Sequence, residues 1–233
     1  MEQVRHLGVI MDGNRRWARA NAFDLIQGHN KGADKFGHLC EWCLQAGIPY
    51  LTVYAFSTEN WKRTDKEINH LFSIMEKHFL LEKSRCVEKD IKIMIIGERG
   101  RFTPHILGII SDMENATVNC KKLIVQIALS YGGRDEIVRA AKKFAQDAKA
   151  GKIDVDEFTE DVFELYLDTA NIPDVDLVIR TGGSENRRLS NFLPWQSVYS
   201  ELFFSDLLWP EFDEDEFKRA LEYFASVKRR LGK

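Results

Sequence analysis

Several features that mark specialised classes of protein are absent from this 233-residue sequence. No apolar run approaches the roughly 20 residues that a helix needs to span a bilayer, and the first residues lack the apolar core of a secretory signal. Basic and acidic residues number 33 and 36, for a formal net charge of −3, whereas nucleic-acid-binding domains usually carry a strongly basic surface. We therefore expect a cytoplasmic protein that does not bind nucleic acid.

Cysteine is scarce, and no Pro/Gly-rich linker, repeat or low-complexity segment divides the chain. Cys40 and Cys43 have CxxC spacing, but Cys86 and Cys120 do not form the second pair that a tetrahedral metal site needs. The CxxC segment also fits one face of a helix, so we predict buried structural thiols there. The length suits one large domain, and we predict a single domain over residues 1–233.

Short apolar runs with strand character alternate with helical patterns along the chain. The predicted strands are residues 7–11, 50–56, 91–96, 123–129, 177–179 and 202–204. Helical spacing begins near Asp65, Arg134 and Asp213. The second of these helices is expected to stop at Gly151, because glycine is typical of the position after a helix end. This alternation predicts an α/β fold in which helices flank a central, mainly parallel six-stranded sheet.

Glycine, asparagine, serine and arginine gather directly after four of the predicted strands. These segments are residues 12–17, 57–63, 131–134 and 180–191. In parallel α/β sheets the ligand site lies in the crevice beyond the carboxyl ends of the strands. Since backbone N–H groups and guanidinium groups bind anions, the sequence predicts anion recognition at this edge.

The strand ends suggest two anion sites. Residues 12–14 precede an arginine-rich helix start and offer N–H groups to a phosphate, while Asp12 suits a Mg²⁺ ligand that bridges to a diphosphate. The alternative for Asp12 is a helix N-cap. Arg180, Arg187 and Arg188 suit a second diphosphate clamp, and the alternative for them is a solvated run of charge. Two anion sites in one crevice suggest two phosphorylated substrates.

Five motifs, in order along the chain, resemble those of cis-prenyltransferases, the undecaprenyl diphosphate synthase family. They are HLGVIMDGNRRW (6–17), GH (28–29), YAFSTENWKR (54–63), RTGGSENRRLSNFLPW (180–195) and YSE (199–201). The resemblance extends over essentially the whole chain. It implies a Mg²⁺-dependent enzyme that adds isopentenyl diphosphate to an allylic diphosphate primer, farnesyl diphosphate or shorter, with cis geometry.

The same resemblance implies roles for individual residues. Asp12 and Asn60 are implied to be catalytic, and Asp12 and Glu201 to be metal ligands. The residues implied to bind the two substrates are Gly13, Asn14, Arg15, Arg16, Trp17, His29, Ser57, Thr58, Glu59, Trp61, Arg63, Arg180, Arg188, Ser190 and Arg230. Arg230 belongs to a tail that reaches the partner subunit in relatives, so a homodimer is implied.

One departure from the family pattern concerns the primer. Leu25 stands four residues before His29, where bacterial relatives usually carry an arginine that contacts the allylic diphosphate. The contact is either missing or supplied by Arg15, Arg19 or Lys31. Primer affinity and primer choice are the properties that this change affects.

A second departure is a loop after Arg180 that is two residues longer than the usual RTxGExRxS pattern. Either Arg187 or Arg188 can take the role in isopentenyl diphosphate binding. Either Ser184 or Glu185 can occupy the family's glutamate position.

The growing product of such an enzyme needs an apolar slot. The helix expected over residues 65–81, together with Leu123 and Ile127, either lines that slot or belongs to the ordinary core. The helix residues that share this face are Ile68, Leu71, Phe72, Met75 and Phe79. We expect undecaprenyl diphosphate, a lipid carrier for cell-wall synthesis, with at most peripheral membrane contact for its release. A short-chain product is the alternative.

Other functions are less compatible with the sequence. It has no DDxxD, the motif expected of trans-prenyltransferases, and the acidic residues 213–216 suit the start of a helix. A non-catalytic partner subunit would tend to lose the aspartate loop, which is present here. A nucleotide-binding α/β protein would need GxxxxGK[ST] or GxGxxG, and both are absent.

Overall fold

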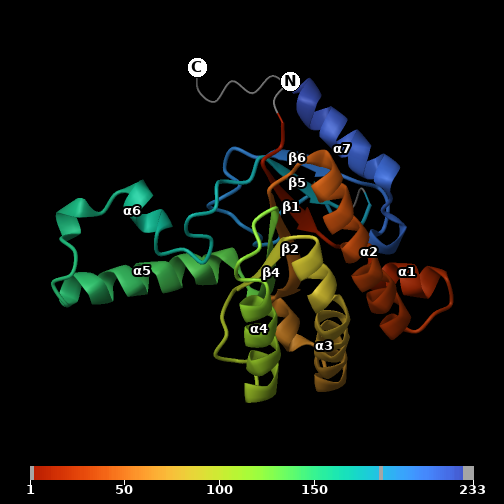
Figure 1. Cartoon of the computed structure of the whole chain (residues 1–233), viewed down its shortest axis with the longest axis horizontal. Coiled ribbons are helices and arrows are strands. Elements are labelled where there is room, and N and C mark those ends of the chain that lie inside the picture. The colour runs from red at the N-terminus through yellow and green to blue at the C-terminus, as the bar shows by residue number, and fades with distance from the viewer. Residues whose placement is uncertain (1–2, 184–185, 228–233) are drawn as a thin grey trace.

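The computed structural model describes residues 3–183 and 186–227 (Figure 1). Six strands form one sheet in the order β3-β4-β2-β1-β5-β6, and all five neighbouring pairs are parallel. The prediction of an α/β fold with a central six-stranded sheet is therefore confirmed. Within the described residues the sheet is parallel throughout.

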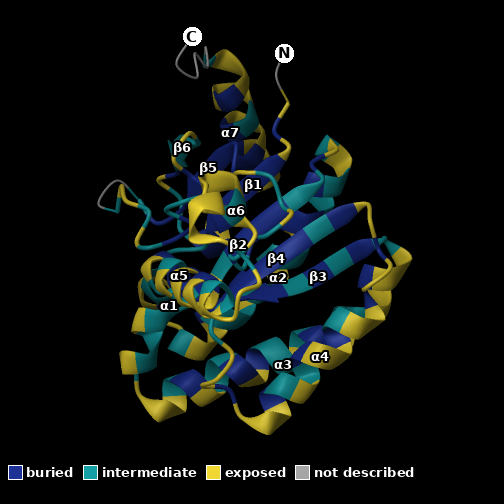
Figure 2. Ribbon diagram, turned by 90° about the vertical axis from the view of Figure 1, so that its left-hand side faces the viewer, coloured by how far each residue is buried: buried dark blue, intermediate teal, exposed yellow. Residues whose placement is uncertain are grey.

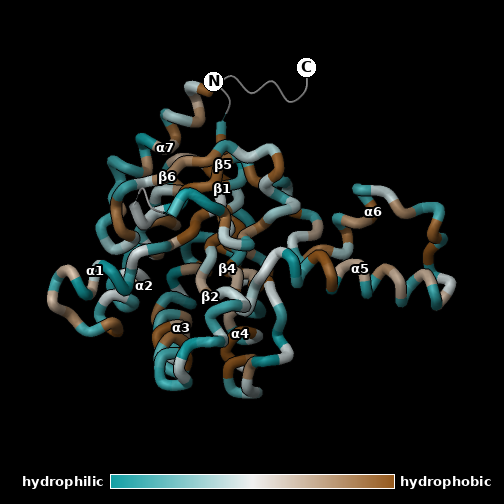
Figure 3. Tube along the Cα trace, turned by 180° about the vertical axis from the view of Figure 1, so that it is seen from behind, coloured by the Kyte–Doolittle hydropathy of each residue, from teal (hydrophilic) through white to brown (hydrophobic). Residues whose placement is uncertain are grey.

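Each predicted strand is present, with bounds that differ by at most two residues. The strands are β1 (His6–Ile10), β2 (Tyr50–Ser57), β3 (Ile91–Ile96), β4 (Leu123–Tyr131), β5 (Leu177–Arg180) and β6 (Glu201–Phe204). β1 and β5 are buried along their whole length, because a parallel sheet is covered on both faces. Figure 3 shows the same strands as mainly hydrophobic stretches of the chain.

The helices begin where their capping residues predict. They are α1 (Asn14–Ala20), α2 (Leu25–Ala46), α3 (Asp65–Glu88), α4 (Pro104–Ala116), α5 (Gly133–Lys149), α6 (Glu160–Glu164) and α7 (Glu214–Ser226), with 3₁₀ turns η1 (Thr58–Lys62), η2 (Val155–Glu157) and η3 (Trp209–Glu211). Gly151 lies two residues beyond α5 with a φ of +70°. Asp213 caps α7 by accepting a hydrogen bond from the Glu216 N–H at 2.9 Å, so the acidic run starts a helix, as predicted.

One face of the sheet carries the largest part of the core. Side chains of α2, α3, α4 and α7 pack there against alternate strand residues such as Val9, Val53 and Ile127, as the two-residue period of a strand requires. In Figure 2 the strands are largely dark blue, while the outer sides of α3 and α4 are yellow. α5 and α6 extend sideways from this body (Figure 1).

The connections place the two longest helices side by side. α2 joins β1 to β2 and α3 joins β2 to β3, so both start at the carboxyl edge of the parallel sheet and end at its amino edge. Ion pairs join them at matching positions, Asp34 to His78 and Glu41 to Arg85. This arrangement makes α2 and α3 parallel walls that descend from the edge where the predicted site lies.

Two further findings concern predicted absences. Cys40, Cys43, Cys86 and Cys120 are buried free thiols, as predicted for structural cysteines, and burial raises the pKa of Cys43 well above its usual range. None of the helices within the described ranges is long and apolar enough to cross a membrane.

Candidate active site

Three charged side chains meet where β1 and β5 end side by side. The Asp12 carboxylate accepts a hydrogen bond from Arg180 Nη2 at 2.9 Å and another from Arg16 Nη2 at 3.2 Å. The Asp12 side chain is 30% exposed, whereas that of Arg180 is only 6% exposed. Thr181 fixes the backbone here, because its hydroxyl accepts from the Asp12 N–H at 3.0 Å and donates to the Asp12 carbonyl at 2.7 Å. Asp12 therefore lies among cations, as its sequence context predicts.

The alternative prediction, that Asp12 is a helix N-cap, is wrong. Gly13 occupies the N-cap position of α1, with a φ of +114° that favours glycine. Gly182 is equally constrained, since an added Cβ would lie 2.6 Å from Arg16 Nη2. Its carbonyl accepts a hydrogen bond from Arg16 Nη1 at 2.6 Å. These two glycines let the backbone approach the charged group closely enough to hold Arg16 in place.

The loop after β5 closes over Arg180. Arg180 Nη1 donates to Ser190 Oγ at 2.7 Å and to the carbonyl of Arg188, while its buried Nε has no partner among the described residues. The Arg188 guanidinium is exposed and donates to Asn186 at 2.9 Å, and Arg187 is exposed as well. The predicted isopentenyl diphosphate residues are thus brought together. Arg180 is internally bonded, and Arg187 and Arg188 face solvent.

The predicted flexible segment after β2 is the 3₁₀ turn η1. Asn60 accepts a hydrogen bond from the Ser57 N–H at 3.0 Å, and Trp61 Nε1 donates to Ser130 Oγ at 2.8 Å. Arg101, from the loop after β3, lies 4.6 Å from the centre of the Trp61 ring. Sequence reasoning did not identify Arg101, whose position over an aromatic face favours a cation–π contact.

Asn191 links three strand ends. Its Nδ2 donates to Glu59 Oε1 at 3.2 Å, its Oδ1 accepts from the Arg134 N–H at 2.9 Å, and its carbonyl accepts from the Gly133 N–H at 2.8 Å. Thr58 contributes a hydrogen bond to the same Glu59 carboxylate at 3.2 Å. The φ of +68° at Asn191, tolerated by asparagine, makes these contacts possible. The segments after β2, β4 and β5 are therefore mechanically connected.

A second charged group lies where α1, α2 and α3 meet. Arg63 Nη1 donates to Glu67 Oε1 at 3.0 Å, and Arg15 Nη1 lies 3.5 Å from the same oxygen. His29 is beside them. Burial lowers the pKa of His29 to about 4, and Arg63 acts in the same direction. His29 is therefore neutral at pH 7. Its buried Nε2 has no partner among the described residues, so an orphaned polar atom lies next to two arginines.

Glycine also brings α1 against α2. A Cβ on Gly28 would lie 2.3 Å from the Asn14 carbonyl, and one on Gly32 would lie 2.2 Å from Asn14 Oδ1. That oxygen is buried and has no partner among the described residues. Sequence reasoning missed Gly32, although its four-residue spacing from Gly28 is a signal of close helix packing. Trp17 lies on the outer part of α1, with its ring centre 5.6 Å from that of Phe23.

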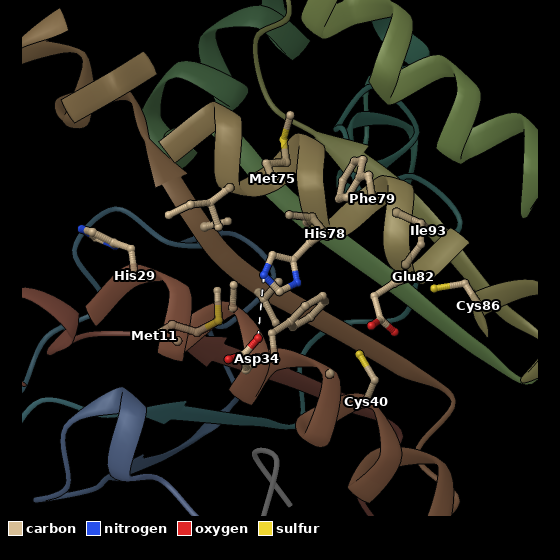
Figure 4. Close-up of a pocket in the computed structure, with 18 of the residues that line it drawn as sticks. Met11, His29, Asp34, Cys40, Met75, His78, Phe79, Glu82, Cys86 and Ile93 are labelled. Atoms are coloured by element: carbon tan, nitrogen blue, oxygen red, sulfur yellow. Dashed lines mark ion pairs between the residues drawn. The ribbon is translucent and has the colours of Figure 1, made fainter. Parts of the chain in front are cut away.

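An apolar cavity of about 400 Å³ begins beside both charged groups and runs between α2, α3 and the sheet (Figure 4). Met11, Asn14 and His29 line its upper end. The residues of its body that sequence analysis predicted are Leu71, Phe72, Met75, Phe79 and Ile127. Ile68 and Leu123 do not line the cavity and belong to the core. The helix over residues 65–81 is thus both core and cavity wall.

The predicted metal ligands Asp12 and Glu201 are not brought together within one chain. Glu201 pairs with Leu177, which pairs with Leu7, so Glu201 lies at the amino edge of the sheet. Asp12 is five residues beyond Leu7, about 16 Å at 3.3 Å per residue. No group of three or more metal-binding side chains occurs in the described part of the chain. Asp12, a partly exposed hard oxygen donor among cations, fits a role as one Mg²⁺ ligand.

Three predicted positions fall on residues that carry no structural description. Arg230, Ser184 and Glu185 lie outside the described ranges. Leu25, at the position of the missing arginine, is the first residue of α2 and is half-buried. Of its three candidate replacements, Arg15 joins the charged group around Glu67, whereas Arg19 and Lys31 are exposed.

Known proteins match this chain over nearly its whole length. A family model described as undecaprenyl diphosphate synthase matches residues 10–232. The tritrans,polycis-undecaprenyl-diphosphate synthase (geranylgeranyl-diphosphate specific) of Thermoplasma volcanium is 43% identical over 98% of this chain and 89% of its own. The ditrans,polycis-undecaprenyl-diphosphate synthase ((2E,6E)-farnesyl-diphosphate specific) of Pseudomonas syringae pv. tomato is 41% identical over 98% of this chain and 90% of its own.

A solved structure agrees with the sequence relatives. Lavandulyl diphosphate synthase from Lavandula x intermedia, in complex with dimethylallyl diphosphate, is similar with a TM-score of 0.95 and 32% identity over 99% of both chains. The similarity therefore covers the strand-end segments and the helices around the cavity as well as the sheet. The chain belongs to the cis-prenyltransferase family, whose members include the undecaprenyl diphosphate synthases.

Proposed function

We propose that this protein condenses isopentenyl diphosphate with an allylic diphosphate in cis geometry and repeats the step to make a polyprenyl diphosphate. One observation carries the proposal. Arginine-rich groups at the strand ends open directly into an apolar cavity between α2 and α3. A substrate with a charged diphosphate head and a hydrocarbon tail is complementary to that arrangement.

The two charged groups suit the two substrates. The allylic diphosphate is proposed to lie against Asn14, Arg15, Arg16, His29 and Arg63, because these residues surround the upper end of the cavity that would receive its tail. Isopentenyl diphosphate has no long tail. We assign it to the side of the crevice formed by Arg180, Arg188 and Ser190.

The proposed reaction breaks the allylic C1–O bond, and the diphosphate leaves with the electron pair. The double bond of isopentenyl diphosphate attacks C1, a new C–C bond forms, and a proton leaves the added unit. Arg15, Arg16 and Arg63 would stabilise the charge that develops on the leaving diphosphate. Asn60 and Trp61, fixed by Ser57 and Ser130, would orient the substrates across the crevice, which lowers the entropic part of the barrier.

Mg²⁺ is proposed as the cofactor, with Asp12 as its protein ligand. When bound, it would neutralise charge on the diphosphate oxygens. Arg16 and Arg180 hold the Asp12 carboxylate from two sides, so the ligand is oriented before any cation arrives. Glu201 of the same chain is too far along the sheet to share that ion, and we leave it out of the proposed ligand set.

For the primer and the product, we propose farnesyl diphosphate and undecaprenyl diphosphate. The Pseudomonas syringae relative is named for a farnesyl primer and the Thermoplasma volcanium relative for a geranylgeranyl primer, and both are named undecaprenyl-diphosphate synthases. A short-chain product is the second candidate. Two observations favour it: Leu25 in place of an arginine, and similarity to a synthase solved with dimethylallyl diphosphate.

We further propose a cytoplasmic homodimer that contacts membrane only to release its product. β6 is an edge strand whose residues are all half-exposed, and Val198 just before it is 68% exposed. An unpaired edge beside apolar surface suits association with a second copy. Light scattering of the purified protein measures this directly.

The test of the function is incorporation of labelled isopentenyl units. Purified protein with Mg²⁺, isopentenyl diphosphate and farnesyl diphosphate should give longer prenyl diphosphates, which mass analysis identifies by length. Asp12→Asn should reduce turnover by about 10²–10³-fold, since it removes an electrostatic contact used in the transition state. Asp112→Asn, at an exposed carboxylate on α4, is the matched control. No product with farnesyl, geranylgeranyl, geranyl or dimethylallyl diphosphate would contradict the proposal.

A further inference from the structure

An ion-pair cluster joins α2 and α3 at the lower end of the cavity. Glu41 of α2 accepts hydrogen bonds from Arg85 of α3 and from Lys89, the residue that follows α3. Arg85 also donates to Glu82 at 3.2 Å. All four side chains line the cavity, and their formal charges cancel. We call Glu41, Arg85 and Lys89 the α2–α3 gate.

The gate lies far from the charged groups where the diphosphates are proposed to bind. Both helices descend from the carboxyl edge of the sheet, and Lys89 lies next to the start of β3 at the amino edge. α2 advances twelve residues from His29 to Glu41, which is about 18 Å of helix at 1.5 Å per residue. On α3, the eighteen residues from Leu71 to Lys89 correspond to about 27 Å.

The walls between the two ends are mainly apolar or sulfur-bearing. Figure 4 shows Met75, Phe79 and Cys86 of α3 facing the cavity opposite Cys40 of α2. One other ion pair, His78 with Asp34 at 3.9 Å, crosses between the helices partway down. The Asp34 carboxylate is 63% exposed, so this pair lies at the solvent side of the cavity. The gate is the first cluster of full charges that a tail would meet at the bottom.

The gate is charged at neutral pH. The hydrogen bond from Lys89, reinforced by that from Arg85, holds the pKa of Glu41 below its usual range. Its side chains are partly exposed, at 28% for Glu41 and 45% for Arg85, so they are solvated from outside. A hydrocarbon tail that reached them would have to separate the ion pairs and cover charges with apolar surface. Burying charges without compensating partners is strongly unfavourable.

We propose that the α2–α3 gate sets the length of the product by stopping the tail of the growing prenyl chain at the bottom of the cavity. This inference rests on the proposed function, since it requires the cavity to hold that chain. Each condensation pushes the tail deeper by one isoprene unit. Elongation slows when the next unit can be accommodated only by opening the contacts of Glu41 with Arg85 and Lys89.

Substitution of Glu41 tests the gate, because this carboxylate holds both cations. Glu41→Ala removes the anion and opens space, and Glu41→Gln removes the charge at nearly constant volume. With Mg²⁺, farnesyl diphosphate and excess isopentenyl diphosphate, we expect the main product of Glu41→Ala to be at least one isoprene unit longer than that of the wild type. Glu41→Gln should shift in the same direction. Mass analysis after dephosphorylation gives the length distribution.

Lys83→Ala is the matched control. It removes an ion pair of 2.7 Å between α3 and Asp112 of α4, and neither residue lines the cavity. Its products should have the wild-type length. An equal shift in Lys83→Ala would indicate general loosening of α3 and would overturn the proposal. Unchanged lengths in the Glu41 variants would overturn it too.

The experiment separates this inference from the function on which it rests. If the wild-type protein incorporates no isopentenyl units with any primer, the proposed function fails before the gate is tested. If it incorporates them and the Glu41 variants give wild-type lengths, only the gate fails. Thermal unfolding of each variant precedes the assay, and Glu41→Gln decides the outcome if Glu41→Ala does not fold.

Discussion

At the scale of single residues, arginine pairs with carboxylates in a repeated pattern. Arg16 and Arg180 flank Asp12, and Arg15 and Arg63 flank Glu67. Each group has two guanidiniums and one carboxylate, so each carries a local charge of +1 before any substrate binds. A chain with a formal net charge of −3 can therefore present two cationic sites, because the excess acidic residues lie elsewhere on the surface.

Arg15 is the residue that we expect to replace the arginine missing at position 25. It lies 3.5 Å from Glu67 beside Arg63, at the upper end of the cavity. Arg15→Gly should raise the KM for the allylic primer about tenfold, the effect of losing one charge-assisted hydrogen bond of roughly 1.5 kcal/mol. Steady-state kinetics with farnesyl diphosphate as the varied substrate measure this.

The double variant identifies the cause. Leu25→Arg should lower the primer KM markedly in the Arg15→Gly background and only slightly in the wild type, because one arginine then does the work of the other. If Leu25→Arg improves primer binding equally in both backgrounds, Arg15 does not compensate for the missing contact.

At the scale of elements, the site depends on how closely α1 packs against α2. Asn14 starts α1, and its backbone and side chain press against the glycine-lined face of α2 at Gly28 and Gly32. Trp209 of η3 encloses the same contact, since its Nε1 donates to the Gly32 carbonyl at 2.8 Å. The helix that carries Arg15 and Arg16 is positioned by this packing.

Two glycine substitutions should therefore have opposite effects on stability. Gly32→Ala places a methyl group 2.2 Å from Asn14 Oδ1 and 2.8 Å from Trp209 Cδ1, and overpacking of this kind costs about 1–3 kcal/mol. Gly108→Ala, on α4, meets nothing within 4 Å and should stabilise the helix by up to about 1 kcal/mol. Thermal unfolding should show a lower Tm for the first variant and a higher Tm for the second. Equal shifts would refute the packing explanation.

At the scale of the whole molecule, the fold was predictable because its signals are local. Runs such as residues 91–96 and 123–129 have the continuous hydrophobicity of buried parallel strands, and Asp213 announces its helix through capping chemistry. Asp12 was assigned to the site correctly, since carboxyl ends of parallel strands meet at one edge.

Contacts between distant segments were not predictable in the same way. The bond from Arg180 to Asp12 spans 168 positions, and nothing in either local sequence signals that Arg180 is internally paired. Glu201 shows the converse. Its motif suggested a shared metal site, but strand register places it at the opposite edge of the sheet from Asp12. Register depends on the global pairing of strands, which a single sequence does not display.

The stability of the whole molecule should depend on pH through a histidine at that opposite edge. His6 is buried in β1, donates from Nδ1 to the Pro173 carbonyl at 2.6 Å and contacts Thr52 through Nε2 at 2.8 Å. Burial lowers the pKa of His6 from 6.5 to about 4. Between these values the unfolded chain binds a proton that the folded chain rejects, so acid favours unfolding. His29, whose pKa is also lowered to about 4, acts with the same sign.

We therefore expect the free energy of unfolding to be constant with respect to these groups above pH 6.5 and to fall as the pH drops from about 6.5 to about 4. The pKa change of His6 corresponds to a loss of about 3 kcal/mol at the acid end. Urea unfolding at intervals across this range measures the slope. His6→Gln removes one titrating group and keeps a side chain that can hydrogen bond, so its slope should be shallower than that of the wild type. A variant with the wild-type slope would show that His6 is not the group responsible, and the acid sensitivity would then have to come from His29 beside the arginines of the active site.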